Sequence, residues 1–197
     1  MKPRPRRPNP IADDAHHGVD DDSQPVIVPR IERALVPTSP ERIQRLRKHL
    51  LEALRALRTM RKPGGGTTPP AEPTGFVARV ARTACTLCEG WCCKGGGEHA
   101  YLDERTLARL CATTPGLSAR SILRLYLRRV PENGHAGSCI FHGQQGCTLE
   151  PSQRSDVCND YFCGGLGTFV TRGDTTTPVR VFAGEGARLR VSPVLKP

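Results

Sequence analysis

Residues 85–93 read CTLCEGWCC and contain four of the nine cysteines in the chain. Four more cysteines follow downstream with the spacing Cys-x7-Cys-x10-Cys-x4-Cys. Cysteine thiolates are soft ligands that select zinc, copper(I) or iron–sulfur clusters. The two groups therefore predict two halves of a metal site that folding brings together. The eight candidate ligands are Cys85, Cys88, Cys92, Cys93, Cys139, Cys147, Cys158 and Cys163.

The spacing of the first group constrains how its sulfurs are used. A Cys-x2-Cys pair spans one tight turn, so the sulfurs of Cys85 and Cys88 can both reach one ion. Cys92 and Cys93 are adjacent, and adjacent side chains diverge. We therefore expect them to serve as ligands of different ions, or as one ligand and one outer partner.

The number of thiols leaves two kinds of centre open. Eight thiols suit two four-thiolate zinc sites, or one iron–sulfur cluster with spare thiols. The bacterial ferredoxin spacing Cys-x2-Cys-x2-Cys-x3-Cys-Pro is absent. His99, His135 and His142 lie near the two groups and are candidates to replace a thiol, although an ordinary surface role is expected for each. Acidic residues next to the cysteines, such as Glu89 and Asp156, are expected to face solvent.

Two other uses of cysteine compete with a metal site. One is a framework of four disulfides plus one free thiol, and the other is a thioredoxin-type redox pair. The first residues are basic, but no apolar run of a secretory signal follows them. We therefore expect a cytoplasmic protein, where dense cysteines favour metal over disulfides. Cys111 lies outside the pattern and is expected to be a core thiol.

The composition is thin for a large core. Apolar residues make up 37% of the 197 residues and aromatic residues 5%, with 18 Pro and 20 Gly. A small core of this kind gains from a metal or disulfide staple. The net charge is +10. Such an excess is compatible with salt-sensitive contact with nucleic acid or anionic surfaces, or simply with a solvated basic surface.

The chain divides into four parts by composition: a disordered tail (1–38), an amphipathic basic helix (39–62), a Gly/Pro linker (63–74) and a cysteine-cluster metal-binding domain (75–197). The helix begins at the capping sequence Thr38-Ser39-Pro40-Glu41. One apolar stripe follows it at helical spacing. Its residues are Ile43, Leu46, Leu50, Ala53, Leu57 and Met60. We expect this helix to pack on the domain or on a second copy of itself.

The metal-binding domain is predicted to be a small, irregular α+β unit, mainly helical and organised by its metal. Residues 76–82 have no clear state. A short strand is predicted over 99–102, helices over 104–112 and 119–130, and a short hairpin or irregular tail over 166–192. No stretch approaches the length of a membrane helix.

The segment from Cys85 to Cys93 resembles the N-terminal signature of the YkgJ-like cysteine cluster family, described as a zinc- or iron-chelating domain. Later residues resemble the second half of the family: Cys139, Phe141, Cys147, Arg154, Cys158, Tyr161 and Cys163. The resemblance covers about residues 80–165 and all eight cysteines. Ser155 stands where the family tends to have Pro, and Asn159 where it tends to have Arg. The resemblance implies chelation of zinc or iron and no particular reaction.

The sequence is therefore compatible with three functions. The first is a zinc- or iron-binding cysteine-cluster protein whose metal folds the domain. The second is an iron–sulfur redox protein or enzyme. The third is a zinc-stabilised nucleic-acid-binding or regulatory adaptor. Candidate partners are another protein or a second copy of the chain, bound through helix 39–62, and nucleic acid.

Overall fold

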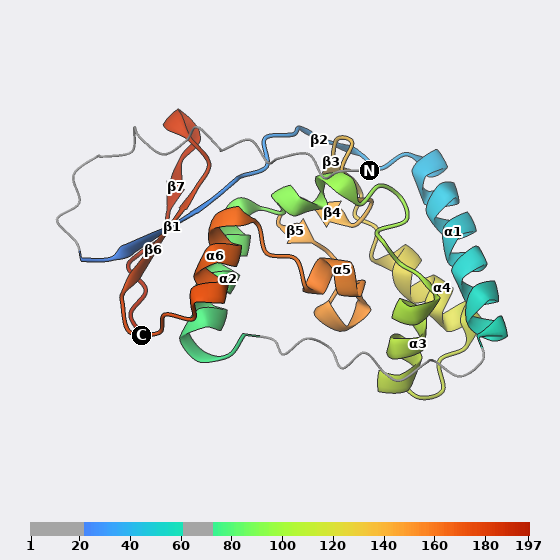
Figure 1. The fold of residues 1–197 in the computed structure, drawn as a ribbon. Helices are drawn as coiled ribbons and strands as arrows, with labels where there is room; N and C mark the ends of the chain where they lie inside the picture. Colours follow the sequence, from blue (N-terminus) through green and yellow to red (C-terminus); the bar gives the residue numbers. More distant parts are fainter. Residues whose placement is uncertain (1–21, 61–72) are drawn as a thin grey trace, which may run out of the picture.

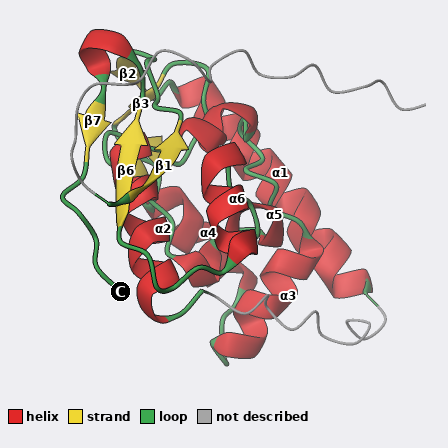
Figure 2. Ribbon diagram, turned by 60° about the vertical axis from the view of Figure 1, so that its left-hand side comes forward, coloured by secondary structure: helices red, strands yellow, loops and turns green. Residues whose placement is uncertain are grey.

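The computed structural model describes residues 22–60 and 73–197, which form a small, mainly helical α+β domain. A three-stranded sheet with two helices lies on one side of the molecule and three helices on the other (Figures 1 and 2). The first group contains β1 (Gln24–Val28), β6 (Val179–Ala183), β7 (Arg190–Val191), α2 (Gly75–Cys88) and α6 (Gly164–Arg172). The second contains α1 (Pro40–Thr59), α3 (Glu104–Thr113) and α4 (Ala119–Arg128).

Short elements connect the two sides. Strands β2 (Leu35–Pro37) and β3 (Asn133–His135) form one antiparallel pair, and β4 (His142–Gly143) and β5 (Gly146–Cys147) form another. Helix α5 (Asp156–Asn159) is a single turn. Three 3-10 turns complete the fold: η1 (Trp91–Gly95), η2 (Pro151–Gln153) and η3 (Gly186–Arg188).

The sheet joins the two ends of the described chain. Strand β1 pairs in parallel with β6, so that Gln24 lies opposite Val179 and Val28 opposite Ala183. Strand β7 pairs antiparallel on the other side of β6. Val26 and Val28 are buried whereas Ile27 is exposed, the alternation of a strand with one face on a core.

This pairing corrects the predicted disordered tail over 1–38. Residues 24–28 and 35–37 are strands, and only residues 1–21 of that segment lie outside the described residues. Each strand is short, and its partner lies about a hundred residues or more further along the chain. A local pattern cannot reveal pairing at that separation.

Helix α1 forms as predicted. The Ser39 side chain accepts a hydrogen bond from the Arg42 N–H, and Pro40 occupies the first turn. Leu46 and Leu50 on the apolar stripe are fully buried. The helix packs on α3 and α4 and so shares a core with the predicted metal-binding domain. Its last predicted residues, 61 and 62, and most of the predicted linker lie outside the described residues.

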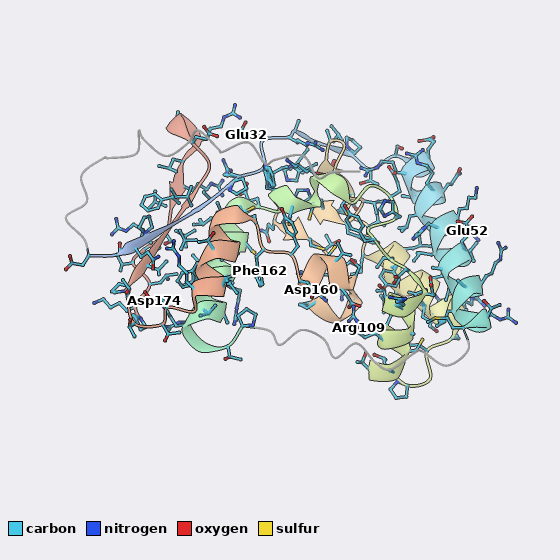
Figure 3. All side chains as sticks on the ribbon, viewed as in Figure 1. Glu32, Glu52, Arg109, Asp160, Phe162 and Asp174 are labelled. Atoms are coloured by element: carbon cyan, nitrogen blue, oxygen red, sulfur yellow. The ribbon has the colours of Figure 1, made fainter. Side chains whose placement is uncertain are left out.

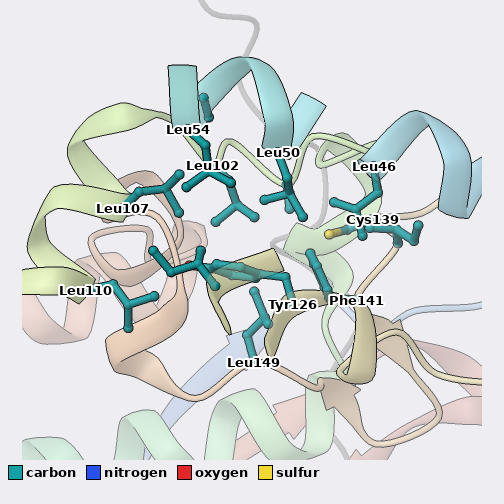
Figure 4. Packing of buried hydrophobic residues seen from close by; sticks show 14 residues of the cluster. Leu46, Leu50, Leu54, Leu102, Leu107, Leu110, Tyr126, Cys139, Phe141 and Leu149 are labelled. Carbon is teal, nitrogen blue, oxygen red and sulfur yellow. The ribbon is translucent and has the colours of Figure 1, made fainter. Parts of the chain in front are cut away.

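Two hydrophobic cores result. The helical core lies between α1, α3, α4 and the segment before η2, with Tyr126 and Phe141 as its largest buried side chains (Figure 4). The Tyr126 hydroxyl donates a hydrogen bond to the Gln153 carbonyl at 2.9 Å, which satisfies its one buried polar group. The sheet core lies between the sheet, α2 and α6, and is centred on Val80, Val179 and Val181.

Other local predictions have mixed outcomes. Helices α3 and α4 are confirmed, with Asp103 and Ser118 as their N-caps. The β6–β7 hairpin is confirmed, but α6 was not predicted. Residues 76–82 are part of helix α2. The strand predicted over 99–102 is wrong, because Ala100 and Tyr101 adopt positive φ angles in a turn. Among the helices in the described ranges, none is long and apolar enough to cross a membrane.

Candidate metal centre

The eight predicted ligands lie where the two cores meet. Cys85 and Cys88 occupy the last turn of α2, and Cys92 and Cys93 lie in η1 immediately after it. Cys163 is the N-cap of α6. The remaining three, Cys139, Cys147 and Cys158, come from the loop after β3, from β5 and from α5. All nine cysteines of the chain have free thiols, so the structure contains none of the bridges of a disulfide framework.

Four thiols form a group next to the sheet core, here called the sheet-side group: Cys85, Cys88, Cys92 and Cys163. Desolvation and then the neighbouring thiols of Cys88, Cys92 and Cys163 raise the pKa of Cys85 to about 12. Desolvation and then Cys88 raise the pKa of Cys163, with a further contribution from Cys92. Cys88 is part of the sheet core, and Cys163 packs against it.

The other four thiols form a group next to the helical core, here called the helical-side group: Cys93, Cys139, Cys147 and Cys158. Desolvation raises the pKa of Cys139 to about 12, with contributions from Cys147 and Cys158. Cys147 likewise contributes to the raised pKa values of Cys93 and Cys158. Cys139 belongs to the helical core, and Cys93 and Cys147 pack against it.

The adjacent residues Cys92 and Cys93 connect the two groups. Their thiols are hydrogen-bonded to each other, and this bond lowers the pKa of Cys92 and raises that of Cys93. Cys139 and Cys147 act on Cys93, whereas Cys92 acts on Cys85, Cys88 and Cys163 and also on Cys158 of the helical-side group. The two thiols therefore contact each other instead of diverging as their adjacency predicted, although each also has neighbours of its own.

Backbone N–H groups are directed at some of these sulfurs. The Trp91 N–H donates to the Cys88 Sγ at 3.3 Å. At the start of α6, the Leu166 N–H donates to the Cys163 thiol, and this hydrogen bond opposes the rise in the pKa of Cys163. Hydrogen bonds and helix N-termini favour the thiolate, which is the form that binds metal.

The turn after Cys88 depends on two left-handed residues. Glu89 has φ of 55° and Gly90 has φ of 86°. A Cβ on Gly90 would lie 2.5 Å from the His142 Nε2 atom, so only glycine fits. His142 is fully buried, and its Nε2 atom lies 2.6 Å from the Glu89 carbonyl oxygen. The imidazole thus fixes the peptide between Cys88 and Cys92 from the side of β4.

None of the three predicted histidine candidates is placed as a ligand. His142 and His135 are buried, not surface residues as expected, and each ring has one nitrogen near a backbone carbonyl. Their rings lie 4.4 Å apart between centroids. His99 is exposed and packs against His49 and Tyr101. Cys111, predicted to be a buried core thiol, is half-buried on α3 and packs against the helical core without belonging to it.

Arg154 is a further functional candidate. It belongs to the segment that resembles the YkgJ-like family, but the spacing of the cysteines gave no reason to single it out. Its Nε atom donates to the Leu149 carbonyl at 2.9 Å. Its positive charge acts to lower the pKa values of Cys85, Cys92 and Cys158, which belong to both groups. A fixed cation at this place would offset part of the negative charge that eight thiolates bring together.

The segment around Arg154 is held by helix α3. Arg109 on α3, labelled in Figure 3, is the residue that does so. It forms an ion pair with Asp156 at 3.0 Å and donates to the Ser152 and Arg154 carbonyls. Ser155, where the resembled family tends to have Pro, caps α5 and accepts from the Cys158 N–H. Asn159, the second departure, donates to the Pro151 carbonyl. Both departures therefore have a local structural role beside Cys158.

Glu89 was expected to face solvent, and the structure corrects this. Its carboxylate accepts from Arg30 at 2.9 Å and from Arg190, and only 19% of its side chain is exposed. Arg30 follows β1 and Arg190 begins β7. Glu89 thus ties the turn between Cys88 and Cys92 to both ends of the described chain.

Glu89→Gln is expected to lower the free energy of unfolding by about 1–2 kcal/mol, because two charge-assisted hydrogen bonds lose their ionised acceptor. Urea unfolding in low salt measures the loss, which should shrink in high salt because part of it is electrostatic. The matched control is Glu52→Gln, at an exposed position on α1 (Figure 3). Equal stability of the two variants would show that the pair of arginines contributes nothing.

The residue types suit thiolate ligation of a metal, but the sulfur atoms are not close enough together to hold an ion. Within residues 22–60 and 73–197, no group of three or more Cys, His, Asp or Glu side chains is placed to hold a metal ion. The thiols are close enough to shift one another's pKa values without converging on a point. Binding an ion would therefore require the sulfurs of each group to draw together.

Comparison of the chain with protein-family models, with curated proteins and with solved structures finds no significant match in any of the three. The resemblance to the YkgJ-like family therefore rests on the quoted cysteine motifs alone.

Proposed function

We propose that this chain is a cytoplasmic metal-binding protein that holds zinc or iron in two four-thiolate groups. The observation that carries the proposal is that eight free thiols gather between the two hydrophobic cores. Cys88 and Cys163 belong to or pack on the sheet core, whereas Cys93, Cys139 and Cys147 belong to or pack on the helical core. Thiolates are the common ligands of structural zinc and of iron–sulfur clusters. A reducing compartment keeps such thiols available for metal.

The metal in this proposal has a structural effect. The two cores have separate sets of buried residues, and the thiol groups lie at the edge of each. An ion bound by Cys85, Cys88, Cys92 and Cys163 would join the end of α2 to the start of α6. An ion bound by the helical-side group would join η1 to β5 and α5. Since Cys92 and Cys93 are consecutive, the two ions would also fix the cores to each other.

The experiment that tests the proposal measures metal and acid-labile sulfide on protein purified without oxygen. Zinc at about two equivalents and a colourless solution are expected for two four-thiolate zinc sites. Iron with sulfide and visible absorption would instead assign an iron–sulfur centre and direct the function towards redox chemistry. Protein that retains neither metal, and takes up neither on reconstitution, would contradict the proposal.

The division into two groups has its own test. Cys85→Ser and Cys147→Ser each remove one thiol from a different group, so each is expected to lose about half of the bound metal. The control is Cys111→Ser, which makes the same chemical change outside both groups and should keep the full amount. If either ligand variant loses all the metal while still folded, the eight thiols act as a single centre and the division is wrong.

A further inference from the structure

A groove with arginine walls lies between α1 and α4, away from the thiol groups. It has a volume of about 350 Å³ and is lined by Arg47, Arg120, Leu123, Arg124, Leu127 and Arg128. The two leucines form its floor and are only partly buried. Leu51, one turn after Arg47 on α1, extends the apolar surface and is 37% exposed. Apolar side chains are therefore left open between a row of arginines on α4 and Arg47 on α1.

The arginines of the groove are regularly spaced. Arg120, Arg124 and Arg128 follow one another at intervals of four residues, so they lie on one face of α4 about 6 Å apart. Helix α4 contains no acidic residue. Among the ion pairs formed by the described residues, none involves these three side chains or Arg47. Like charges at this spacing repel one another, so the row costs stability unless something anionic covers it.

From this combination we infer that the α1–α4 groove binds an acidic amphipathic helix of a partner protein. A helix laid in the groove would place its apolar side chains on Leu123 and Leu127. Carboxylates at four-residue intervals along its edge would meet Arg120, Arg124 and Arg128 in register. The planar guanidinium group pairs with a carboxylate through two hydrogen bonds, which adds geometric specificity to the charge attraction.

The same features disfavour other anionic partners. Nucleic acid offers phosphates and stacking bases, but no aromatic side chain lines this groove, and phosphates would leave the leucines uncovered. A membrane surface requires a continuous apolar helix face turned outward. The apolar face of α1 is instead buried against α3 and α4. A second copy of the chain would bring another strongly basic surface.

The test uses the full chain and a labelled synthetic peptide of roughly 18 residues, long enough to form a helix when bound. The peptide carries Leu at positions i, i+3, i+4 and i+7 with Glu on both flanks. Fluorescence polarisation should show saturable binding, and Arg120→Glu combined with Arg124→Glu should weaken it at least about tenfold. The matched control is Arg105→Glu combined with Arg172→Glu. It makes the same charge change at exposed positions outside the groove and should leave the affinity within about twofold.

Further probes decide between the partner classes. A peptide with Lys in place of Glu, and one with Ser in place of Leu, should both fail to bind. The inference is overturned if the acidic peptide does not bind, or if it binds both double variants equally. It is also overturned if single-stranded RNA or anionic lipid vesicles bind more tightly than the peptide and are lost with the Arg120 and Arg124 changes. Metal content measured on each variant shows that the outcome is separate from the thiol groups.

Discussion

Cys88→Ser is expected to lose the metal of the sheet-side group and, with it, the cooperative unfolding of the protein. Cys88 is 6% exposed and lies in the sheet core, at the end of α2 and under the N–H of Trp91. A serine hydroxyl is not a thiolate ligand, and it would leave a polar group among apolar side chains. We expect the free energy of unfolding to fall by about 4 kcal/mol or more, because a lost metal site belongs to the most damaging changes.

Thermal and urea unfolding followed by circular dichroism measure this effect beside the metal content of the same sample. The wild type should give one sharp transition, and the variant a broad transition at lower temperature. Cys111→Ser is the control, since it exchanges the same atoms in a residue that packs against the helical core without belonging to either thiol group. A Cys88→Ser protein that melts and binds metal like the wild type would refute the proposed structural role of the metal.

Gly165→Ala is expected to destabilise the protein by about 3 kcal/mol or more through packing alone. Gly165 lies in the first turn of α6, where the helix crosses strand β1. A Cβ at this position would lie 3.0 Å from the Ile27 carbonyl carbon and much closer still to its oxygen. Both are backbone atoms of a paired strand, so neither can move without shifting β1 or α6.

The preceding residue supplies the matched control. A Cβ on Gly164 meets no heavy atom within 4 Å. Gly164→Ala should therefore be neutral or stabilise by up to about 1 kcal/mol, since alanine is the better helix former. Urea unfolding of the two variants side by side measures the difference. Similar stabilities would mean that α6 does not approach β1 as closely as the structure has it.

The two changes separate metal from packing. A strong chelator added to the wild type should broaden the unfolding transition at least as much as Cys88→Ser does, because it removes the ion of the sheet-side group together with that of the helical-side group. The loss of stability in Gly165→Ala is different, because it comes from a backbone clash and does not depend on bound metal. It should therefore be the same at any metal concentration. If the chelator leaves the wild type unchanged, the metal does not hold the two cores together.

The sequence alone was sufficient for features that depend on neighbours along the chain. The caps Ser39, Asp103 and Ser118 and the apolar spacing that follows each of them predicted α1, α3 and α4, because helices are made by contacts three and four residues apart. The cysteine spacing likewise singled out eight candidate thiols, whose use as metal ligands stays a prediction.

Tertiary structure decided everything that depends on distant partners. Strand β1 exists because Gln24–Val28 meets Val179–Ala183, and without that partner its five residues looked disordered. The same holds for Glu89, whose two arginines come from opposite ends of the described chain. The order of the cysteines also did not show which of them are neighbours, since Cys163 lies near Cys88, and Cys93 lies near Cys139 and Cys147 as well as Cys92. Local patterns record what a residue prefers, whereas pairing, burial and charge neighbours are settled only when segments far apart in the chain pack together.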